Sequence, residues 1–434
     1  MTQMMAAREG RVTPEMTHVA RDEKVPVEVI LEGVARGTII IPHSGGRSKA
    51  TRAVGIGRGL RTKVNASVGA SSEGSDAGGE IDKLRVAISA GADTIMELSS
   101  GGDLDFLRRQ VLEIAPVPVG TVPIYQAALE AIEQRGSIVD MTPEDMFEVI
   151  ERQGADGVDF MAIHCALSLE VVARLRQQGR VADIVSRGGA FLTAWMLHHE
   201  RENPLYEQFD RVLEIAQRHD VTLSIGDAIR PGCIADSLDR AQVQGLLLVG
   251  ELVERAREAG VQVMVEGPGH VPVPQIEATV LLEKQVCKGA PYFVLGTLVT
   301  DIAPGYDHIT AAIGGTIAAT AGADFICYVT PAEHLGLPSA QDVREGVIAA
   351  RIAAHAADLA KGVKGAWAWD LAMARARKAL DWEAQFRLAM DPDKPRRLRA
   401  ERSPGGSDAC SMCGPHCAMK LISEYLGRKE TETC

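Results

Sequence analysis

The fold is decided by a repeating pattern, seen most clearly in Val221-Thr-Leu-Ser-Ile-Gly-Asp227, residues 246–259 and Gln262-Val-Met-Val-Glu266. The first and last segments are short and almost continuously apolar, as parallel strands buried on both faces are. The middle segment carries its apolar residues on one helical face: Leu248, Val249, Leu252, Val253 and Ala256. The pattern predicts a strand–helix–strand unit with a parallel sheet.

The same alternation extends over residues 63–331. Nine segments are strand candidates: 63–69, 94–99, 118–122, 158–164, 182–187, 221–227, 262–266, 292–295 and 324–328. Strictly alternating strands and helices over this length predict an α/β fold, a (β/α)8 TIM-type barrel. A barrel closes with eight strands, so one candidate must lie outside it. A doubly wound open sheet is the alternative.

Composition narrows the class of protein. The chain has 434 residues, 46% of them hydrophobic, and carries a net charge of −12. The acidic balance argues against a general nucleic-acid binder. No run approaches the roughly 18–20 apolar residues of a membrane span, and the first residues lack the plan of a signal peptide. We therefore expect a cytoplasmic protein that binds neither nucleic acid nor membrane.

Three segments flank the predicted barrel of residues 63–339. Residues 1–62 form an N-terminal extension with a capped helix starting at Thr13-Pro14-Glu15, and residues 340–390 are helical and Ala-rich. Residues 391–434 combine a basic run, Lys394-Pro-Arg-Arg-Leu-Arg399, with Ser403-Pro-Gly-Gly-Ser407. This composition predicts a flexible tail that carries a small metal module.

Polar side chains follow the predicted strands, at the end where barrel enzymes place their chemistry. The main ones are Ser67, Tyr125, His164, Ser186, Arg187, Gly188, Asp227, Arg230, Glu266, His270 and His334. Ser186-Arg-Gly-Gly189 offers a hydroxyl, a guanidinium and backbone N–H groups, which suit a phosphate. A structural glycine turn is the alternative. His270 and His334 follow neighbouring strands, as ligands of a divalent metal would.

Three of the eight cysteines lie close together, in Cys410-Ser-Met-Cys413-Gly-Pro-His-Cys417. Three thiolates at this spacing can hold three irons of a [4Fe–4S] cluster and leave the fourth iron open. They can also hold a structural zinc with His416 as fourth ligand. Spacing alone leaves both possibilities open.

Long motifs throughout the chain resemble the phosphomethylpyrimidine synthase family of thiamin biosynthesis. The cysteine segment is one, and the others are Val185–Gly189, Val263–Pro272, Leu298–Ile309, Tyr328–Pro338 and Ala353–Gly362. The resemblance implies a radical S-adenosylmethionine enzyme that acts on 5-aminoimidazole ribotide and takes an electron from an external one-electron reductant. It also implies a homodimer in which each tail reaches the partner's active site.

The resemblance assigns roles residue by residue. It implies substrate contacts at Ser67, Met96, Tyr125, His164, Ser186, Arg187, Gly188, Asp227, Ala228, Ile229, Arg230, Glu266 and Phe293. Tyr125, His164, Asp227 and Glu266 are the candidates for catalytic proton transfer. It implies that His270 and His334 bind Zn²⁺ and that Cys410, Cys413 and Cys417 hold the [4Fe–4S] cluster.

The chain departs from the thiamin enzymes at several positions. Ser67 stands where the family has Asn, Phe293 where it has Tyr, and Thr297 where it has Pro, and Asp227-Ala-Ile-Arg230 and His43-Ser-Gly-Gly-Arg47 are also different. A site that loses an amide and a phenol should steer its substrate differently. These departures favour the sister branch, 5-hydroxybenzimidazole synthase of anaerobic cobamide biosynthesis. The alternatives are phosphomethylpyrimidine synthase, a zinc-dependent barrel hydrolase with a zinc-bound tail, and a phosphate-binding module without turnover.

Overall fold

A computed structural model describes residues 1–47, 51–71, 77–402 and 409–426. The chain divides into two compact units, residues 1–363 and 364–434. Within the described residues, no helix is long and apolar enough to cross a membrane.

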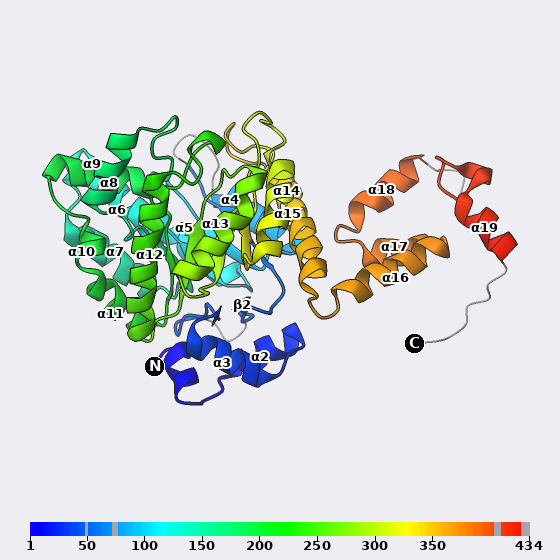
Figure 1. Ribbon diagram of the computed structural model, residues 1–434, viewed down its shortest axis with the longest axis horizontal. Coiled ribbons are helices and arrows are strands. Elements are labelled where there is room, and N and C mark those ends of the chain that lie inside the picture. Colours follow the sequence, from blue (N-terminus) through cyan, green and yellow to red (C-terminus); the bar gives the residue numbers. More distant parts are fainter. Residues whose placement is uncertain (48–50, 72–76, 403–408, 427–434) are drawn as a thin grey trace. The chain divides into compact units, whose positions relative to one another are not determined.

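The larger unit is a closed barrel of eight parallel strands, as the alternating pattern predicts (Figure 1). Its strands run in the order β10-β3-β4-β5-β6-β7-β8-β9, and β10 closes the barrel by pairing with β3. The strands are β3 (Lys63–Val68), β4 (Thr94–Glu97), β5 (Val119–Thr121), β6 (Phe160–Ile163), β7 (Thr222–Ile225), β8 (Val263–Gly267), β9 (Tyr292–Leu295) and β10 (Phe325–Cys327).

Helices surround the barrel and complete its core. They are α4 (Ala77–Ala90), α5 (Leu104–Ile114), α6 (Pro123–Arg135), α7 (Pro143–Ala155), α8 (Leu169–Gln178), α9 (Arg187–His199), α10 (Pro204–Glu207), α11 (Phe209–His219), α12 (Arg240–Glu258), α13 (Val273–Val286), α14 (Asp307–Ala321) and α15 (Ala340–Lys361). Short 3-10 turns lie at η1 (Ile138–Asp140) and η2 (Ile234–Asp236). The five apolar residues predicted to share one face of α12 are all buried.

One of the nine strand predictions is wrong. Residues 182–187 form no strand, because β6 pairs directly with β7 and the closed barrel leaves no place for a strand between them. The start of the segment is held by a side chain instead. The carboxylate of Asp236 accepts from the backbone N–H groups of Val181 and Ala182, both at 2.9 Å. The segment then ends at Ser186, which caps α9.

The N-terminal extension packs on the end of the barrel opposite the strand carboxyl ends. It contains α1 (Gln3–Arg8), α2 (Pro14–Glu23), α3 (Val27–Arg36), β1 (Ile39–Ile40) and β2 (Ile56–Gly57) around its own apolar cluster. The predicted helix start is confirmed, since the Thr13 side chain caps α2. Gly57 has φ +145°, and a Cβ there would lie 2.2 Å from the Thr38 carbonyl oxygen, so the close approach of β2 to its partner β1 explains this glycine.

An ion pair buried at the base of the barrel ties the extension to the strands. Arg47 Nε lies 3.0 Å from Asp159 Oδ2, and the two side chains are 3% and 0% exposed. Asp159 also accepts from the backbone N–H of Ser44 at 3.0 Å and of Val119 at 2.8 Å. Burial raises the pKa of Asp159 to about 7, which the charge of Arg47 opposes.

Replacing Arg47 with alanine should lower the free energy of unfolding by about 3–5 kcal/mol, because it leaves a buried carboxyl without its cation. The loss should be larger at pH 8 than at pH 5. Folding raises the pKa of Asp159, so binding of a proton by this carboxyl favours the folded state. That contribution to stability is lost as the pH rises towards and through the folded pKa, where the carboxyl becomes charged and depends on Arg47. Calorimetric melting at both pH values measures this, with Arg47→Ala/Asp159→Asn as the control that removes both charges. Equal melting of Arg47→Ala and wild type would contradict the prediction.

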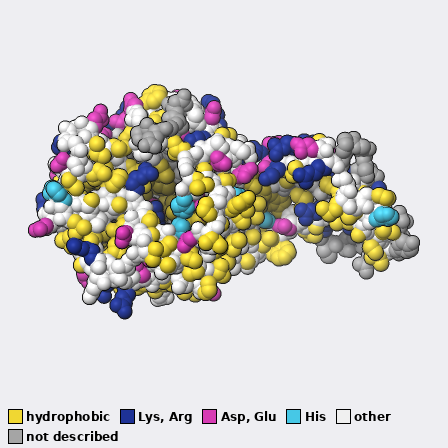
Figure 2. Space-filling model, turned by 90° about the horizontal axis from the view of Figure 1, so that it is seen from above, with side chains coloured by type: hydrophobic (Ala, Val, Ile, Leu, Met, Phe, Trp, Pro, Cys, Tyr) yellow, Lys and Arg dark blue, Asp and Glu magenta, His cyan; other side chains and the backbone are white. Residues whose placement is uncertain are grey.

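The smaller unit is helical. It contains α16 (Ala366–Lys378), α17 (Trp382–Leu388), α18 (Asp393–Arg402), the 3-10 turn η3 (Gly414–His416) and α19 (Ala418–Leu426). The basic run of residues 394–399, predicted as part of a flexible tail, lies in helix α18. The backbone N–H groups of Asp393 and Lys394 at the start of this helix donate to the carboxylate of Asp391. Arg396 pairs with Glu383 on α17, and Arg399 lies 3.6 Å over the ring of Trp382. Lys and Arg side chains gather on this unit (Figure 2). Residues 403–408 and Cys434 lie outside the described residues.

Candidate active site

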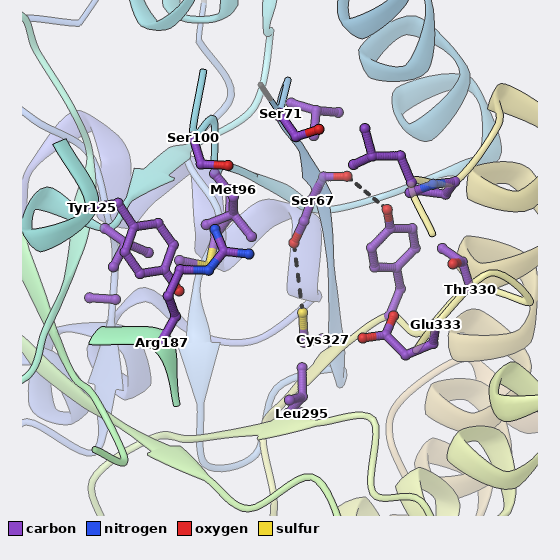
Figure 3. Close-up of a pocket in the computed structure, with 18 of the residues that line it drawn as sticks. Ser67, Ser71, Met96, Ser100, Tyr125, Arg187, Leu295, Cys327, Thr330 and Glu333 are labelled. Atoms are coloured by element: carbon purple, nitrogen blue, oxygen red, sulfur yellow. Dashed lines mark hydrogen bonds between the residues drawn. The ribbon is translucent and has the colours of Figure 1, made fainter. Parts of the chain in front are cut away.

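The carboxyl ends of the strands surround a pocket of about 440 Å³. Figure 3 shows Tyr125 and Arg187 on one side, Thr330 and Glu333 on the other, and Ser67 and Cys327 between them. Nine of the predicted site residues line this pocket: Ser67, Met96, Tyr125, His164, Arg187, Arg230, Glu266, Phe293 and His334. Four of them lie on β3, β4, β8 and β9, and the others follow β5, β6, β7 and β10 in the chain, so all eight strands bring residues to one place, as the barrel prediction requires.

Two guanidinium groups make one side of the pocket basic. The Arg187 guanidinium lies 4.9 Å from the centre of the Tyr125 ring, and Arg230 lines the same pocket. No carboxylate of the described residues lies within ion-pair distance of either guanidinium, although the charge of Arg230 acts on the carboxyls of Asp227 and Glu266. Two cations that lack an internal partner suit an anionic group such as a phosphate.

A neutral histidine lies beside these cations. His164 is 3% exposed, and burial together with the charge of Arg230 lowers its pKa to about 3. Its Nδ1 has no hydrogen-bond partner among the described residues. The imidazole is therefore uncharged at neutral pH, with a ring nitrogen free to hydrogen-bond a ligand.

Three glutamates line the pocket: Glu80, Glu266 and Glu333. Burial raises the pKa of Glu266 and of Glu333, and Arg230 lowers both. Glu266 Oε1 accepts from Ser224 Oγ at 3.0 Å, which holds the carboxyl in place. Carboxyls with raised pKa values can give and take protons near neutral pH.

The Ser186–Gly189 segment is the start of α9. Ser186 Oγ accepts from the backbone N–H of Gly189 at 3.3 Å and caps the helix. A Cβ at Gly188 would lie 2.6 Å from the His164 ring, and a Cβ at Gly189 would lie 1.8 Å from the Ala228 carbonyl oxygen. The two glycines let this helix approach both neighbours closely, so the structure gives them a packing role.

Five residues that the resemblance assigns to substrate lie outside the described lining of the main pocket: Ser186, Gly188, Asp227, Ala228 and Ile229. Ala228 and Ile229 are each 1% exposed. Asp227 instead lines a separate small cavity, which it shares with Glu266. Burial raises the pKa of Asp227 to about 7.

The structure adds residues that the sequence did not single out. Lys83, on helix α4, lines the pocket and pairs with Glu80 at 2.7 Å, and Cys327 lies 3.4 Å from Asn65 Nδ2. Lys83 belongs to a helix, so its position in the sequence gives no sign that it reaches the carboxyl ends of the strands. Cys327 ends β10 and Glu333 follows it, so strand-end position could have identified both.

The two predicted metal-binding histidines lie together, with ring centres 5.4 Å apart. His270 Nδ1 bonds to Asp301 at 2.8 Å, and His334 Nδ1 bonds to Asp307 at 3.1 Å. A carboxylate on one ring nitrogen leaves the other directed to a metal, which is the usual arrangement of histidine ligands. His334 also has φ +62°, a conformation that non-glycine residues adopt rarely and often at functional sites.

The cysteine segment belongs to the smaller unit. Cys410, Cys413 and Cys417 are free thiols, and hydrogen bonds from the backbone of Cys413 and Met412 lower the pKa of Cys410. Thiolates are the form that binds iron, so the donor chemistry fits an iron–sulfur cluster. Among the described residues, no three His, Cys, Asp or Glu side chains already form a metal-binding group.

The fold and the site together define a barrel enzyme of the radical S-adenosylmethionine class. Residues 2–424 match the profile described as "Radical SAM ThiC family", and the chain belongs to that family. Family membership implies a [4Fe–4S] cluster and S-adenosylmethionine as cofactors.

Similar proteins carry two names. Phosphomethylpyrimidine synthase of Desulforudis audaxviator is 64% identical and that of Moorella thermoacetica 63% identical, each over 100% of both chains. "5-hydroxybenzimidazole synthase BzaB" of Moorella thermoacetica is 63% identical over 98% of this chain and 100% of its own. Among solved structures, Yersinia pestis dihydropteroate synthase superposes with a TM-score of 0.40 at 14% identity, covering 70% of this chain and 95% of that one. That distant likeness carries no argument here.

Proposed function

We propose that this enzyme converts 5-aminoimidazole ribotide to 5-hydroxybenzimidazole, as a radical carbon–carbon lyase. The observation that carries the proposal is the wall of the pocket at Ser67 and Phe293. Ser67 Oγ lies 4.0 Å from Cys327 Sγ (Figure 3). The Phe293 ring stacks on Phe325 with centres 4.1 Å apart. Neither side chain supplies the amide or phenol that the thiamin enzymes place there, so a radical intermediate meets different hydrogen-bond partners.

The residues of the pocket have separate tasks in this proposal. Arg187 and Arg230 bind the ribotide phosphate, while His164 and Glu266 orient the imidazole and ribose. Tyr125, His164, Asp227 and Glu266 are available to move protons. When bound, the reduced cluster supplies the electron that cleaves S-adenosylmethionine to the radical that takes a hydrogen atom from the substrate.

Further parts of the proposal concern the metal, the partner chain and the reductant. His270 and His334 would hold a Zn²⁺ ion, supported by the Asp301 and Asp307 carboxylates that fix their rings. The chain would act as a homodimer in which the cysteine segment serves the partner's pocket. The external reductant would be a low-potential one-electron carrier.

The identity of the reaction product tests the proposal. Purified enzyme with its cluster, reduced and free of oxygen, is incubated with 5-aminoimidazole ribotide and S-adenosylmethionine. The expected product has the mass and fluorescence of 5-hydroxybenzimidazole, together with 5′-deoxyadenosine. A pyrimidine phosphate as the product would overturn it.

Phosphomethylpyrimidine synthase is the second candidate, favoured by the names of the relatives at 63–64% identity. The double variant Ser67→Asn/Phe293→Tyr separates the two. If these positions steer the intermediate, the variant should lose most 5-hydroxybenzimidazole while still forming 5′-deoxyadenosine. Mass spectrometry of both products measures the ratio, with each single variant as control. An unchanged product ratio would show that the two positions do not decide the outcome.

A further inference from the structure

A second, smaller cavity lies behind Glu266, between the strands and helices α12 and α13. Asp227, Glu266, Gln242, Thr279 and Tyr292 give it polar walls. It offers about 20 Å³ to a water-sized molecule. Polar cavities of this size hold one ordered water.

Tyr292 is the buried polar group of this cavity. Its side chain is 2% exposed, and its hydroxyl forms no hydrogen bond with any described residue. A buried hydroxyl without a partner is unfavourable, so a ligand is expected there. Gly267 makes room for the phenol, since a Cβ at that position would lie 2.6 Å from the hydroxyl oxygen.

Strand β9 carries two aromatic residues that are adjacent in sequence, Tyr292 and Phe293. Successive side chains of a strand point to opposite faces. Phe293 lines the substrate pocket, while Tyr292 lines the small cavity. Among the described residues Glu266 alone lines both spaces, and its pairing with Phe293 puts its side chain on the substrate-pocket face. The carboxyl on the side of Tyr292 is that of Asp227, whose charge acts on the phenol and which is itself affected by Glu266.

We propose that this cavity binds one water molecule, which joins the Tyr292 hydroxyl to the carboxyl of Asp227. Tyr292 is thereby a positioning residue, because it sets the orientation and protonation of the Asp227 carboxyl, which acts in turn on the neighbouring Glu266 that faces the substrate. The water site stands on the cavity alone, whereas the effect on ribotide binding rests on the proposed function.

The charges around the cavity agree with a shared proton. Burial raises the pKa of both carboxyls, while Arg230 lowers them and Arg180 also lowers that of Asp227. On the far side of the phenol, burial and the nearby Glu283 raise the pKa of Tyr292, with Asp227 and Cys287 adding to it. Tyr125 and Cys327 are further titratable neighbours of Glu266. The phenol therefore stays protonated and can donate to a carboxylate or a water. Two adjacent acids of raised pKa hold one proton between them over a range of pH.

The test is Tyr292→Phe, which removes the hydroxyl and keeps the ring that packs on Gly267. Crystal structures of the wild type and the variant should show the water in the first and its loss or displacement in the second. Ribotide binding, measured by calorimetry from pH 5 to pH 9, should weaken about 3- to 10-fold, as for one lost hydrogen bond. Its pH midpoint should also shift. The matched control is Tyr206→Phe on α10, outside both cavities.

The outcomes are distinct. A dry cavity in the wild-type crystal would overturn the water site. A variant with the wild-type pH midpoint would overturn the positioning role, whatever its melting temperature. A wild-type enzyme that contains the water but binds no ribotide would contradict the proposed function and, with it, the positioning role, while the water site would stand.

Discussion

Replacing Cys413 with serine should abolish 5′-deoxyadenosine formation. Cys410, Cys413 and Cys417 are the only residues of the segment that can supply thiolates, and a serine hydroxyl does not replace a thiolate on an iron–sulfur cluster. Without the cluster no electron reaches S-adenosylmethionine, so we expect a loss of at least about a thousandfold, to the detection limit. Chromatography of anaerobic reactions measures 5′-deoxyadenosine directly.

The same variant should leave the barrel folded, because Cys413 is exposed and belongs to the smaller unit. Circular dichroism and the melting temperature should match the wild type, while iron content should fall well below four per chain and the brown colour should be lost. Cys233→Ser is the matched control, since Cys233 is a free thiol of the larger unit beside Asp236. Wild-type iron content and activity in the Cys413 variant would refute a cluster at this segment.

Replacing Arg187 with alanine should weaken ribotide binding by about 10- to 150-fold. The guanidinium is held over the Tyr125 ring without a carboxylate partner, so it is available to a phosphate. A hydrogen bond to a charged group contributes about 1.5–3 kcal/mol, which gives this range. Titration calorimetry with the ribotide measures the change without any need for the cluster.

Two further variants make the Arg187 result specific. Arg187→Lys keeps the charge but loses the planar fork, so its affinity should fall between those of alanine and wild type. Arg176→Ala on α8 removes an exposed arginine outside the pocket and should bind like the wild type. Equal affinity of Arg187→Ala and wild type would show that the phosphate binds elsewhere.

Periodicity predicted most of the fold. The eight barrel strands were all identified because a strand buried on both faces must be continuously apolar. Residues 182–187 fit the same pattern and still form no strand. In the folded chain β6 pairs directly with β7, and the carboxylate of Asp236, more than fifty residues away in sequence, binds the N–H groups of Val181 and Ala182 at the start of the segment. The local pattern of apolar residues gives no information about a partner so distant in the sequence.

Only part of the candidate site can be predicted from the sequence, for a related reason. Strand ends were found because the barrel brings them to one edge, and Arg187, Arg230, His164 and Glu266 do meet there. Lys83 was missed because a helix side chain reaches the pocket only through the packing of α4. The composition of residues 394–399 predicts a flexible tail, but the structure has them in helix α18. That helix is stabilised by contacts with Glu383 and Trp382 on α17, which composition does not reveal.

The sequence by itself determined the alternating barrel, the family and the types of side chain available for chemistry, because periodicity and motifs are properties of neighbouring residues. Only the tertiary structure decided which of those side chains share a space. It divides the polar residues between a substrate pocket with Arg187 and Arg230 and a small cavity with Asp227 and Tyr292, joined by Glu266. It also places adjacent Tyr292 and Phe293 on opposite faces of β9, in different cavities. The physical reason is that burial and unmet hydrogen bonds depend on partners that the chain brings together only when it folds.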